Sequence, residues 1–230
     1  MRANLLRAIS HDLRTPLTTI YGSSSALLDN YNEFSDEQSK KILAGIKEDS
    51  QWLNGMVENL LSITRLDGAN VNIIKTDTVL DELIDSILVK FAKRYPEQKV
   101  NIDIPEDFVV IPMDPLLIEQ VAINILENAV QHAKGMTKLS LTVFTNSNKA
   151  VFEIMDNGCG IPDEKIEHIF TGYYSKDNVP SDGNRKNAGI GLSVCASIIK
   201  AHGGEIRAES LKGRGCVFRF ALDLEDDCNE

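Results

Sequence analysis

The stretch "MDPLLIEQVAINILENAVQHA" (residues 113–133) decides the fold of the larger part of this chain. Asp114 is a predicted N-cap, and Pro115 suits the first helical position, where a backbone N–H would have no partner. A helix is therefore predicted through Ala133. Extended stretches lie on both sides of it: "KVNIDI" and "DFVVIPM" before it, and the hairpin "TKLSLTVFTN" and "KAVFEIMD" after it.

The same pattern continues outward along the chain. "VLDELIDSILVKFAKRY" and "IGLSVCASIIKAH" are predicted helices, and Gly203 follows the second of them. "GEIRAES" and "GCVFRFAL" are the last predicted strands. Because strands and helices are segregated, we expect an α+β fold, a two-layer α/β sandwich over residues 77–225, followed by an acidic tail at 226–230. The stretch 157–187, rich in Gly, Pro, Ser and Asp, is too long for a plain connection and is predicted to be a functional lid.

The N-terminal residues 1–67 are predicted to form a hairpin of two long helices. The first helix ends near Asp29, and Ser35 with Gln38 forms a predicted capping box for the second. Two helices cannot bury both apolar faces alone, so the expected solution is a homodimer that forms a four-helix bundle. The alternative is a hairpin that packs on the second domain. Gly68 ends the second helix, and residues 68–76 form the predicted linker.

Composition excludes several classes of protein. The chain has 230 residues, 43% of them hydrophobic and 25% charged, as in an ordinary globular protein. Its net charge of −10 argues against nucleic acid as a partner. No stretch has the length of a transmembrane helix, and no signal peptide opens the chain. The four scattered cysteines and four dispersed histidines lack metal-ligand spacing, so reduced thiols in a cytosolic setting are expected.

The stretch "ISHDLRTPLTTI" (residues 9–20) carries a histidine in an unusual setting. At 100° per residue, His11 lies opposite the apolar stripe of its helix and shares its side with Arg14 and Thr15. Pro16 has no N–H for the carbonyl of Asp12, so the helix should kink or loosen one turn after His11. A solvated surface histidine is the alternative, but the neighbouring carboxylate and hydroxyl favour a histidine presented for chemistry.

Three further motifs could bind a nucleotide. Asn124 and Asn128 share one helical face and can offer carbonyl oxygens to Mg²⁺, although two solvated asparagines would look the same. Asp156 ends a strand in "MDNGCGIP" and could accept a hydrogen bond from an exocyclic amine, but D-N-G is also a common turn. "NAGIGLSV" places glycines at a helix start, where free N–H groups attract phosphate. Neither the dinucleotide fingerprint nor a P-loop is present.

Each motif is weak alone, but their order resembles the dimerising and catalytic core of bacterial sensor histidine kinases. "SHDLRTPLT" resembles the H box of this family, "NILENA" its N box, "DNGCGIP" its first glycine box, Ile169-Phe170 its F box, "GIGL" its second glycine box and "GRGCVF" its third. "YGSSSALL" and "SITRLDG" look most like the Kdp-type potassium-responsive sensor kinases. The resemblance covers almost the whole chain and implies an ATP-binding sandwich of the GHKL (Bergerat) type, shared with gyrase-type ATPases and the Hsp90 family.

The resemblance implies a role for each matching residue. His11 would accept the γ-phosphoryl group of ATP, Asp12 would act as base or orient the ring, and Thr15 would position water to dephosphorylate the partner regulator. Thr15 could instead simply bond back to its own helix. Asn128 and Asn124 would hold Mg²⁺. The implied nucleotide-binding residues are Asn124, Asn128, His132, Asp156, Gly158, Gly160, Ile161, Phe170, Lys176, Gly189, Ile190, Gly191 and Leu192.

The sequence also departs from the family pattern. Gln131 replaces a common lysine, for which His132 or Lys134 would substitute in part. Ser175 replaces a usual arginine, and Lys176, Arg185 and Lys186 would supply lid cations instead. Hydrolytic relatives carry a glutamate at the position of Asn124. An amide cannot act as a general base, so transfer to His11 is favoured over hydrolysis.

The implied function is that of a homodimeric, ATP-dependent protein histidine kinase which passes its phosphoryl group to an aspartate of a response regulator. Residues 1–67 would form the dimer, and the chain would be the cytoplasmic portion of a membrane-anchored sensor kinase. Two alternatives remain: a nucleotide-binding dimeric scaffold without phosphotransfer, and a GHKL ATPase with a helical arm.

Overall fold

A computed structural model describes residues 2–30, 33–66, 73–170, 190–211 and 213–225, of which 2–12, 62–66 and 190 are described as backbone only. These residues form two compact units. Of the described residues, those up to Leu61 and Ile190 belong to the first unit, and those from Ser62 to Phe170 and from Gly191 to Glu225 belong to the second. None of the described helices is long and apolar enough to cross a membrane.

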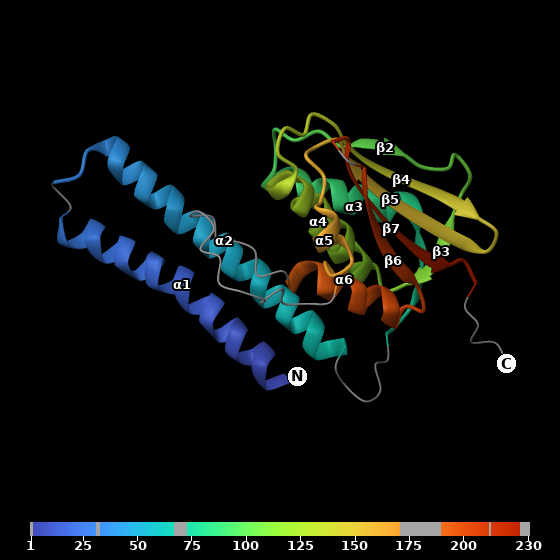
Figure 1. Cartoon of the computed structure of the whole chain (residues 1–230), viewed down its shortest axis with the longest axis horizontal. Helices are drawn as coiled ribbons and strands as arrows, with labels where there is room; N and C mark the ends of the chain where they lie inside the picture. Colours follow the sequence, from blue (N-terminus) through green and yellow to red (C-terminus); the bar gives the residue numbers. More distant parts are fainter. Residues whose placement is uncertain (1, 31–32, 67–72, 171–189, 212, 226–230) are drawn as a thin grey trace. The chain divides into compact units, whose positions relative to one another are not determined.

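The first unit is a helical hairpin, as predicted. Its helices α1 (Arg2–Asp29) and α2 (Asp36–Leu66) run antiparallel (Figure 1). The capping box is confirmed, because the Ser35 hydroxyl accepts the Gln38 N–H at 3.2 Å and the Gln38 amide oxygen accepts the Ser35 N–H at 2.9 Å. Pro16 lies inside α1, which continues through it. The predicted helix end at Gly68 lies outside the described residues.

The second unit contains a five-stranded mixed sheet in the order β2-β4-β5-β7-β6. Only β2 pairs in parallel, with β4, and the other neighbours are antiparallel. A separate pair, β1 with β3, is antiparallel. The strands are β1 (Thr76–Val79), β2 (Asn101–Asp103), β3 (Val110–Met113), β4 (Leu139–Asn146), β5 (Lys149–Asp156), β6 (Glu205–Leu211) and β7 (Gly215–Asp223).

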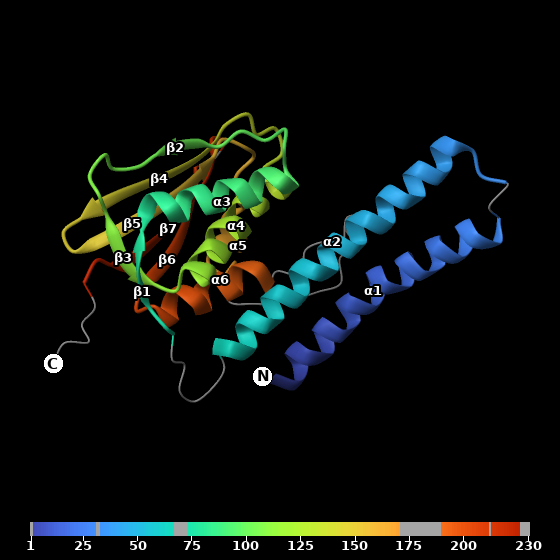
Figure 2. The ribbon, with the colours of Figure 1, turned by 180° about the vertical axis from the view of Figure 1, so that it is seen from behind.

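Helices cover one face of this sheet, which confirms the predicted α+β sandwich. Figures 1 and 2 show α3, α4 and α6 on the same face of the strands. Phe152 of β5 and Phe220 of β7 point into this layer, where their rings stack at 4.7 Å between centroids. The helices are α3 (Leu80–Arg94), α4 (Pro115–His132), the short α5 (Asp163–Ile166) and α6 (Ile190–Ala201).

Helix α4 is the best-buried helix of the sandwich, and its start follows the prediction. The Asp114 carboxylate accepts the N–H groups of Leu116 and Leu117 at 3.1 and 3.2 Å. Ile118 and Ile125 are fully buried, and burying such a side chain stabilises a fold by about 1.5–3 kcal/mol. Helix α4 is therefore held firmly against the sheet, so the polar residues that it carries have fixed positions.

One strand was not predicted. Residues 76–79, "TDTV", form β1, whereas a linker up to residue 76 and a helix from Val79 were expected there. Polar Thr and Asp dominate this strand and its first two residues are exposed, so no alternation of apolar side chains marks it. Its pairing with β3 comes from tertiary contact, with Thr76 opposite Met113 and Val79 opposite Val110.

His202, directly after α6, is a buried titratable group of the sandwich. Its exposed fraction is 3%, and it contacts the Ile198 carbonyl and the Asp114 N–H. Burial lowers the pKa of its imidazole; the Ile198 carbonyl and the Asp114 carboxylate oppose this effect, and Lys75 adds to it. The folded chain therefore holds His202 neutral at a pH where an unfolded chain would protonate it.

This burial predicts that stability falls as the pH drops below about 6.5, the usual pKa of an unfolded histidine. In that window the unfolded chain binds the proton and the folded chain does not, at a cost of up to about 1.4 kcal/mol per pH unit. Urea unfolding between pH 7.5 and 5.5 measures the slope. The variant His202→Gln should have a shallower slope, and an unchanged slope would contradict the assignment.

Candidate functional site

Asp156 is the last residue of β5 and the most buried acidic residue near the predicted site. Its exposed fraction is 5%. The carboxylate accepts the Gly158 N–H at 2.8 Å and a backbone hydrogen bond from Cys216 on the neighbouring strand. Burial raises the pKa of this carboxyl, and the two N–H donors counteract the shift. The carboxylate is thereby held in one orientation and retains lone pairs that can accept from a ligand amine.

The two glycines after Asp156 allow the chain to pass close to neighbouring elements. A side chain at Gly158 would place its Cβ 2.5 Å from the Cβ of Ala133, the residue that caps α4. Gly160 has φ of +73°, and a Cβ there would lie 2.8 Å from the Ser210 hydroxyl. The Ser210 hydroxyl also accepts the Ile161 N–H at 2.9 Å. The loop after β5 is therefore fixed between the end of α4 and the end of β6.

This packing predicts that Gly158→Ala destabilises the second unit by about 1–3 kcal/mol, the usual cost of overpacking. Denaturant unfolding measures the loss. Adding Ala133→Gly should restore only part of it, because the Ala133 backbone atoms Cα and C also lie 2.8 Å from the added methyl group. Gly45→Ala, with nothing within 4 Å, is the control. Equal stability of the wild type and Gly158→Ala would contradict the prediction, because it would show that the loop after β5 can move to accommodate the added methyl group.

Asn157 holds the same loop from the other side, and its role was not predicted. Its side-chain oxygen accepts the N–H groups of Thr137 and Lys138, both at 2.8 Å, and its amide donates to the Thr137 hydroxyl at 2.8 Å. These bonds tie the end of β5 to the connection between α4 and β4. The D-N-G motif indicated a turn but could not indicate its partners. The Ser210 contact with Ile161 was missed for the same reason.

The paired asparagines lie on α4, as predicted, and both are half-buried. The Asn128 amide donates to the Asn124 backbone carbonyl at 2.7 Å, which directs its N–H group inward along the helix. A Cβ added at Gly191, at the start of α6, would lie 3.9 Å from Cγ of Asn124. The N-terminal turn of α6 and the asparagine pair are therefore neighbours. Amide oxygens are suitable ligands for a hard cation such as Mg²⁺.

The ionic and polar neighbours of these asparagines have other partners. Glu127 forms an ion pair with Arg94 of α3 at 2.5 Å. Gln131 donates to the Tyr95 hydroxyl at 3.2 Å, which turns this glutamine toward α3. Burial raises the pKa of Tyr95, so its hydroxyl stays protonated. His132, the last residue of α4, is exposed. Glu127 is thus held in an ion pair, as a structural residue.

The remaining predicted residues fall into three groups. Phe170 packs edge-on against Phe218 of β7 at 6.2 Å between centroids, and Ile161 and Leu192 are half-buried. Lys176, Gly189 and most of the predicted lid lie outside the described residues. Ile190 is described only as the first residue of α6. In the first unit, His11 and Asp12 are described only as part of α1, and Thr15 is exposed.

The cysteines are free thiols where the structure describes them. Cys159 is exposed between Gly158 and Gly160, with its sulfur 3.5 Å from the carbonyl oxygens of His132 and Gly160. Cys195 and Cys216 are buried, and burial raises the pKa of both thiols to about 12. In the described part of the chain, no three His, Cys, Asp or Glu side chains are grouped to hold a metal ion.

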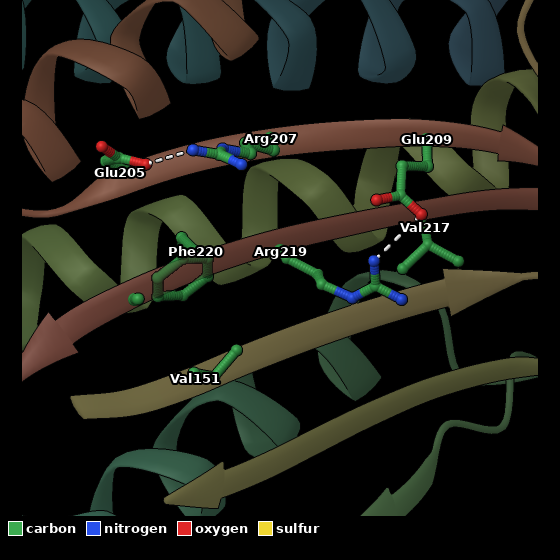
Figure 3. Close-up of a pocket in the computed structure, with 8 residues that line it drawn as sticks. Val151, Glu205, Arg207, Glu209, Val217, Arg219 and Phe220 are labelled. Carbon is green, nitrogen blue, oxygen red and sulfur yellow. Dashed lines mark hydrogen bonds and ion pairs between the residues drawn. The ribbon is translucent and has the colours of Figure 1, made fainter. Parts of the chain in front are cut away.

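A hollow lies on β5, β6 and β7, and Figure 3 shows the side chains that line it. Arg219 crosses it and pairs with Glu153 at 2.5 Å and with Glu209 at 3.0 Å. Arg219 alternates along β7 with the buried Phe218, and Phe220 also borders the hollow. None of the predicted nucleotide-binding residues lines the hollow, so it is not the candidate site.

Comparisons with known proteins agree with this geometry. Residues 1–69 match the family model "His Kinase A (phospho-acceptor) domain". Residues 113–226 match "Histidine kinase-, DNA gyrase B-, and HSP90-like ATPase". The sensor protein KdpD of Clostridium acetobutylicum is 36% identical over 98% of this chain and 25% of its own length. The chain spans between about a quarter and three fifths of the length of the first curated relatives.

Solved structures support the fold. The Acinetobacter baumannii histidine kinase AdeS is 22% identical, with a TM-score of 0.69 over 94% of this chain and 98% of that one. The histidine kinase ThkA in complex with the response regulator protein TrrA is 23% identical, with a TM-score of 0.69 over 96% of this chain and 61% of that one. At this identity the likeness establishes the fold alone.

Proposed function

Because the chain belongs to the sensor histidine kinases, with a phospho-acceptor domain followed by an ATPase domain, we propose that it phosphorylates His11 from ATP. The observation that carries this proposal is the convergence of three distant segments in the second unit. The loop after β5, which carries Asp156, packs against the end of α4, and the start of α6 packs against Asn124 farther along the same helix. Together they combine an acceptor for a base amine with oxygen ligands for a metal and free helix N–H groups for phosphate.

In the proposed reaction, an imidazole nitrogen of His11 attacks the γ-phosphorus of ATP. The N–P bond forms as the bond from the γ-phosphorus to the β–γ bridging oxygen breaks, and ADP leaves with that electron pair. The ring proton passes to the carboxylate of Asp12, the next residue. Transfer to a carboxylate oxygen of a response-regulator aspartate then breaks the N–P bond and regenerates His11. A phosphoramidate is a high-energy donor, which suits such a relay.

The proposed nucleotide contacts are those that the family resemblance implies, and the positions of Asp156, Asn124 and Asn128 in the second unit support them. Asp156 would accept a hydrogen bond from the adenine amine, and Gly158 and Gly160 would let the base approach the backbone. Asn128 and Asn124 would hold Mg²⁺ through their amide oxygens. When bound, Mg²⁺ neutralises charge on the phosphates. His132, Ile161, Phe170, Lys176, Gly189, Ile190, Gly191 and Leu192 complete the proposed nucleotide-binding set.

The residues on α4 favour phosphotransfer over hydrolysis. Asn124 offers an amide where a hydrolytic enzyme needs a base, and an amide cannot accept a proton from water at neutral pH. Glu127, the nearest carboxylate in sequence, is paired with Arg94. Thr15, exposed on α1 one turn after His11, is proposed to position water when the kinase dephosphorylates its regulator. The residual alternatives remain a scaffold without phosphotransfer and a GHKL ATPase.

The proposed partners are a second copy of the chain and a response-regulator receiver domain. Support for the homodimer comes from large apolar side chains that the hairpin leaves exposed. They are Leu17, Tyr21, Leu28, Leu43, Val57 and Leu61. We propose that residues 1–67 bury them in a four-helix bundle, that residues 68–76 link it to the catalytic domain at 77–225, and that 226–230 are a tail. The proposed setting is the cytoplasmic portion of a membrane-anchored sensor.

Labelling with γ-³²P-ATP and Mg²⁺ tests the proposal. The label should resist base and be lost in acid, as a phosphoramidate is, and it should move to an added receiver domain. Bound nucleotide without any label would favour the scaffold. Release of inorganic phosphate with no protein-bound label would favour the ATPase. A label stable to acid would place the phosphoryl group on a hydroxyl and contradict the histidine assignment.

A further inference from the structure

The side chain of His202 forms two hydrogen bonds that define its protonated nitrogen. The Asp114 backbone N–H donates to Nε2 at 3.1 Å, so Nε2 is the acceptor and carries no proton. Nδ1 lies 2.8 Å from the Ile198 carbonyl oxygen, which can only accept. Nδ1 therefore carries the proton and donates. The imidazole is a neutral bridge between the end of α6 and the residue before α4.

Asp114 is an informative partner because it is the N-cap of α4. Its carboxylate accepts two N–H groups of the first helical turn, while its own N–H donates to His202. Asp114 thus caps the start of α4 and at the same time bonds to His202, the residue directly after α6. The Asp114 N–H is partly buried, so the acceptor that Nε2 provides spares it part of the cost of an unpaired donor.

Two more contacts show that α4 and α6 run antiparallel in a regular register. The Cys195 thiol points to the Val121 carbonyl oxygen at 3.8 Å, in the middle of both helices. At the other end, Gly191 lies against Asn124. Moving along α4 from Asp114 to Val121 to Asn124, the partners on α6 run backward from His202 to Cys195 to Gly191.

The contact at His202 is a hydrogen bond from a backbone N–H to an imidazole nitrogen, so it depends on direction as well as on distance. At Cys195 a weak thiol donor points to Val121, and the Asn124 side chain also bonds to this thiol, whereas Gly191 offers no side chain to α4. The bond from Asp114 to Nε2 therefore adds a directional constraint to the register. It lies roughly 15 Å from Asn124, at 1.5 Å of rise per residue over ten residues.

We propose that His202 is a positioning residue for nucleotide binding, which fixes α6 against α4 and thereby sets the spacing between the Gly191 turn and the asparagine pair. The inference rests on the proposed function, in which Gly191 meets phosphate and Asn124 with Asn128 hold the metal. A misplacement of about 1 Å that arises far from the chemistry can cost about a hundredfold in catalytic rate, and remote contacts also alter binding, so a register contact at a distance can affect the site.

Two substitutions of His202 each preserve only one of its two hydrogen bonds. In His202→Gln, Oε1 stands as many bonds from Cα as Nε2 does, and it can accept from Asp114. In His202→Asn, the amide nitrogen replaces Nδ1 and can donate to Ile198, but nothing accepts from Asp114. Ile87→Val and Ile87→Ala serve as controls of stability, because Ile87 is a fully buried residue of α3 and touches neither bond.

Binding of a non-hydrolysable ATP analogue with Mg²⁺ to the whole chain is the first readout, alongside the thermal midpoint of each variant. We expect His202→Asn to weaken binding about tenfold and His202→Gln to stay within about threefold of wild type, the range of remote coupling effects. The Ile87 variants should lose thermal stability without losing affinity.

The proposal would be overturned if His202→Gln and His202→Asn weakened analogue binding equally. It would also be overturned if the Ile87 variants weakened binding in proportion to their lost stability, because His202 would then only stabilise the fold. Unchanged affinity in His202→Asn would overturn it also. Binding of the analogue to the wild-type chain distinguishes a failure of this proposal from a failure of the proposed function. A wild-type chain that fails to bind the analogue contradicts the nucleotide site itself, whereas a wild type that binds leaves only the role of His202 at issue.

Discussion

A chain carrying His11→Gln is expected to bind ATP with wild-type affinity and to acquire no acid-labile phosphoryl group. Glutamine keeps a polar side chain of moderate length on α1, but its amide nitrogen has no available lone pair for attack on phosphorus. Asp156 and Asn128 lie in the other unit of the chain, so the nucleotide contacts are untouched. Labelling and analogue binding, measured on the same preparation, check both halves of the expectation.

Thr18→Ala provides the matched control for His11→Gln. Thr18 is exposed on the same face of α1, and its hydroxyl donates to the Arg14 carbonyl of its own helix at 2.8 Å. Its removal should leave labelling unchanged. Acid-labile label that persists in His11→Gln would mean that a different histidine is the acceptor.

Asp156→Asn is expected to weaken ATP binding strongly while leaving the fold intact. A hydrogen bond to a charged group contributes about 1.5–3 kcal/mol, which corresponds to roughly 10- to 100-fold in affinity. In the variant, the side-chain oxygen can still accept the Gly158 N–H, and the amide N–H group that replaces the other oxygen faces the base, at the cost of one acceptor for the Cys216 N–H. This group would repel the adenine amine, because both are donors.

Inosine triphosphate makes this test more specific. Its base carries an oxygen where adenine carries the amine, so the wild-type carboxylate should disfavour it and the Asp156→Asn amide should accept it. The ratio of ATP to ITP affinity should therefore fall in the variant. Asp163→Asn, which neutralises an exposed carboxylate in α5, is the control. An equal loss of affinity for both nucleotides would show that Asp156 shapes the pocket without contacting the base.

Local chemistry made much of this fold predictable. The Ser35–Gln38 box and the Asp114 cap are interactions within four residues, so the sequence contains both partners. The strand β1 was missed because its pairing with β3 depends on residues far along the chain. At the site, Asp156 and Asn128 were identifiable by residue type and spacing. The contacts that hold them in place could not be identified in the same way.

Asn157 and Ser210 illustrate that limit. Asn157 bonds to residues about twenty positions earlier, and Ser210 bonds to a residue 49 positions earlier. No sequence pattern marks pairs at these separations along the chain, since an asparagine or a serine can bond to any backbone group that the fold brings near. His202 is a third case, because its partner Asp114 lies 88 positions away.

The exposed thiol of Cys159, between Gly158 and Gly160, is a natural site for attaching a fluorophore. A thiolate is the form that couples to a maleimide dye, and the buried Cys195 and Cys216, with pKa values of about 12, remain protonated at pH 7. Once Cys228 is replaced by serine, a fluorophore should attach at Cys159 alone. Attached beside Asp156, it would report the arrival and departure of the base in real time, without radioactivity and without any engineered cysteine.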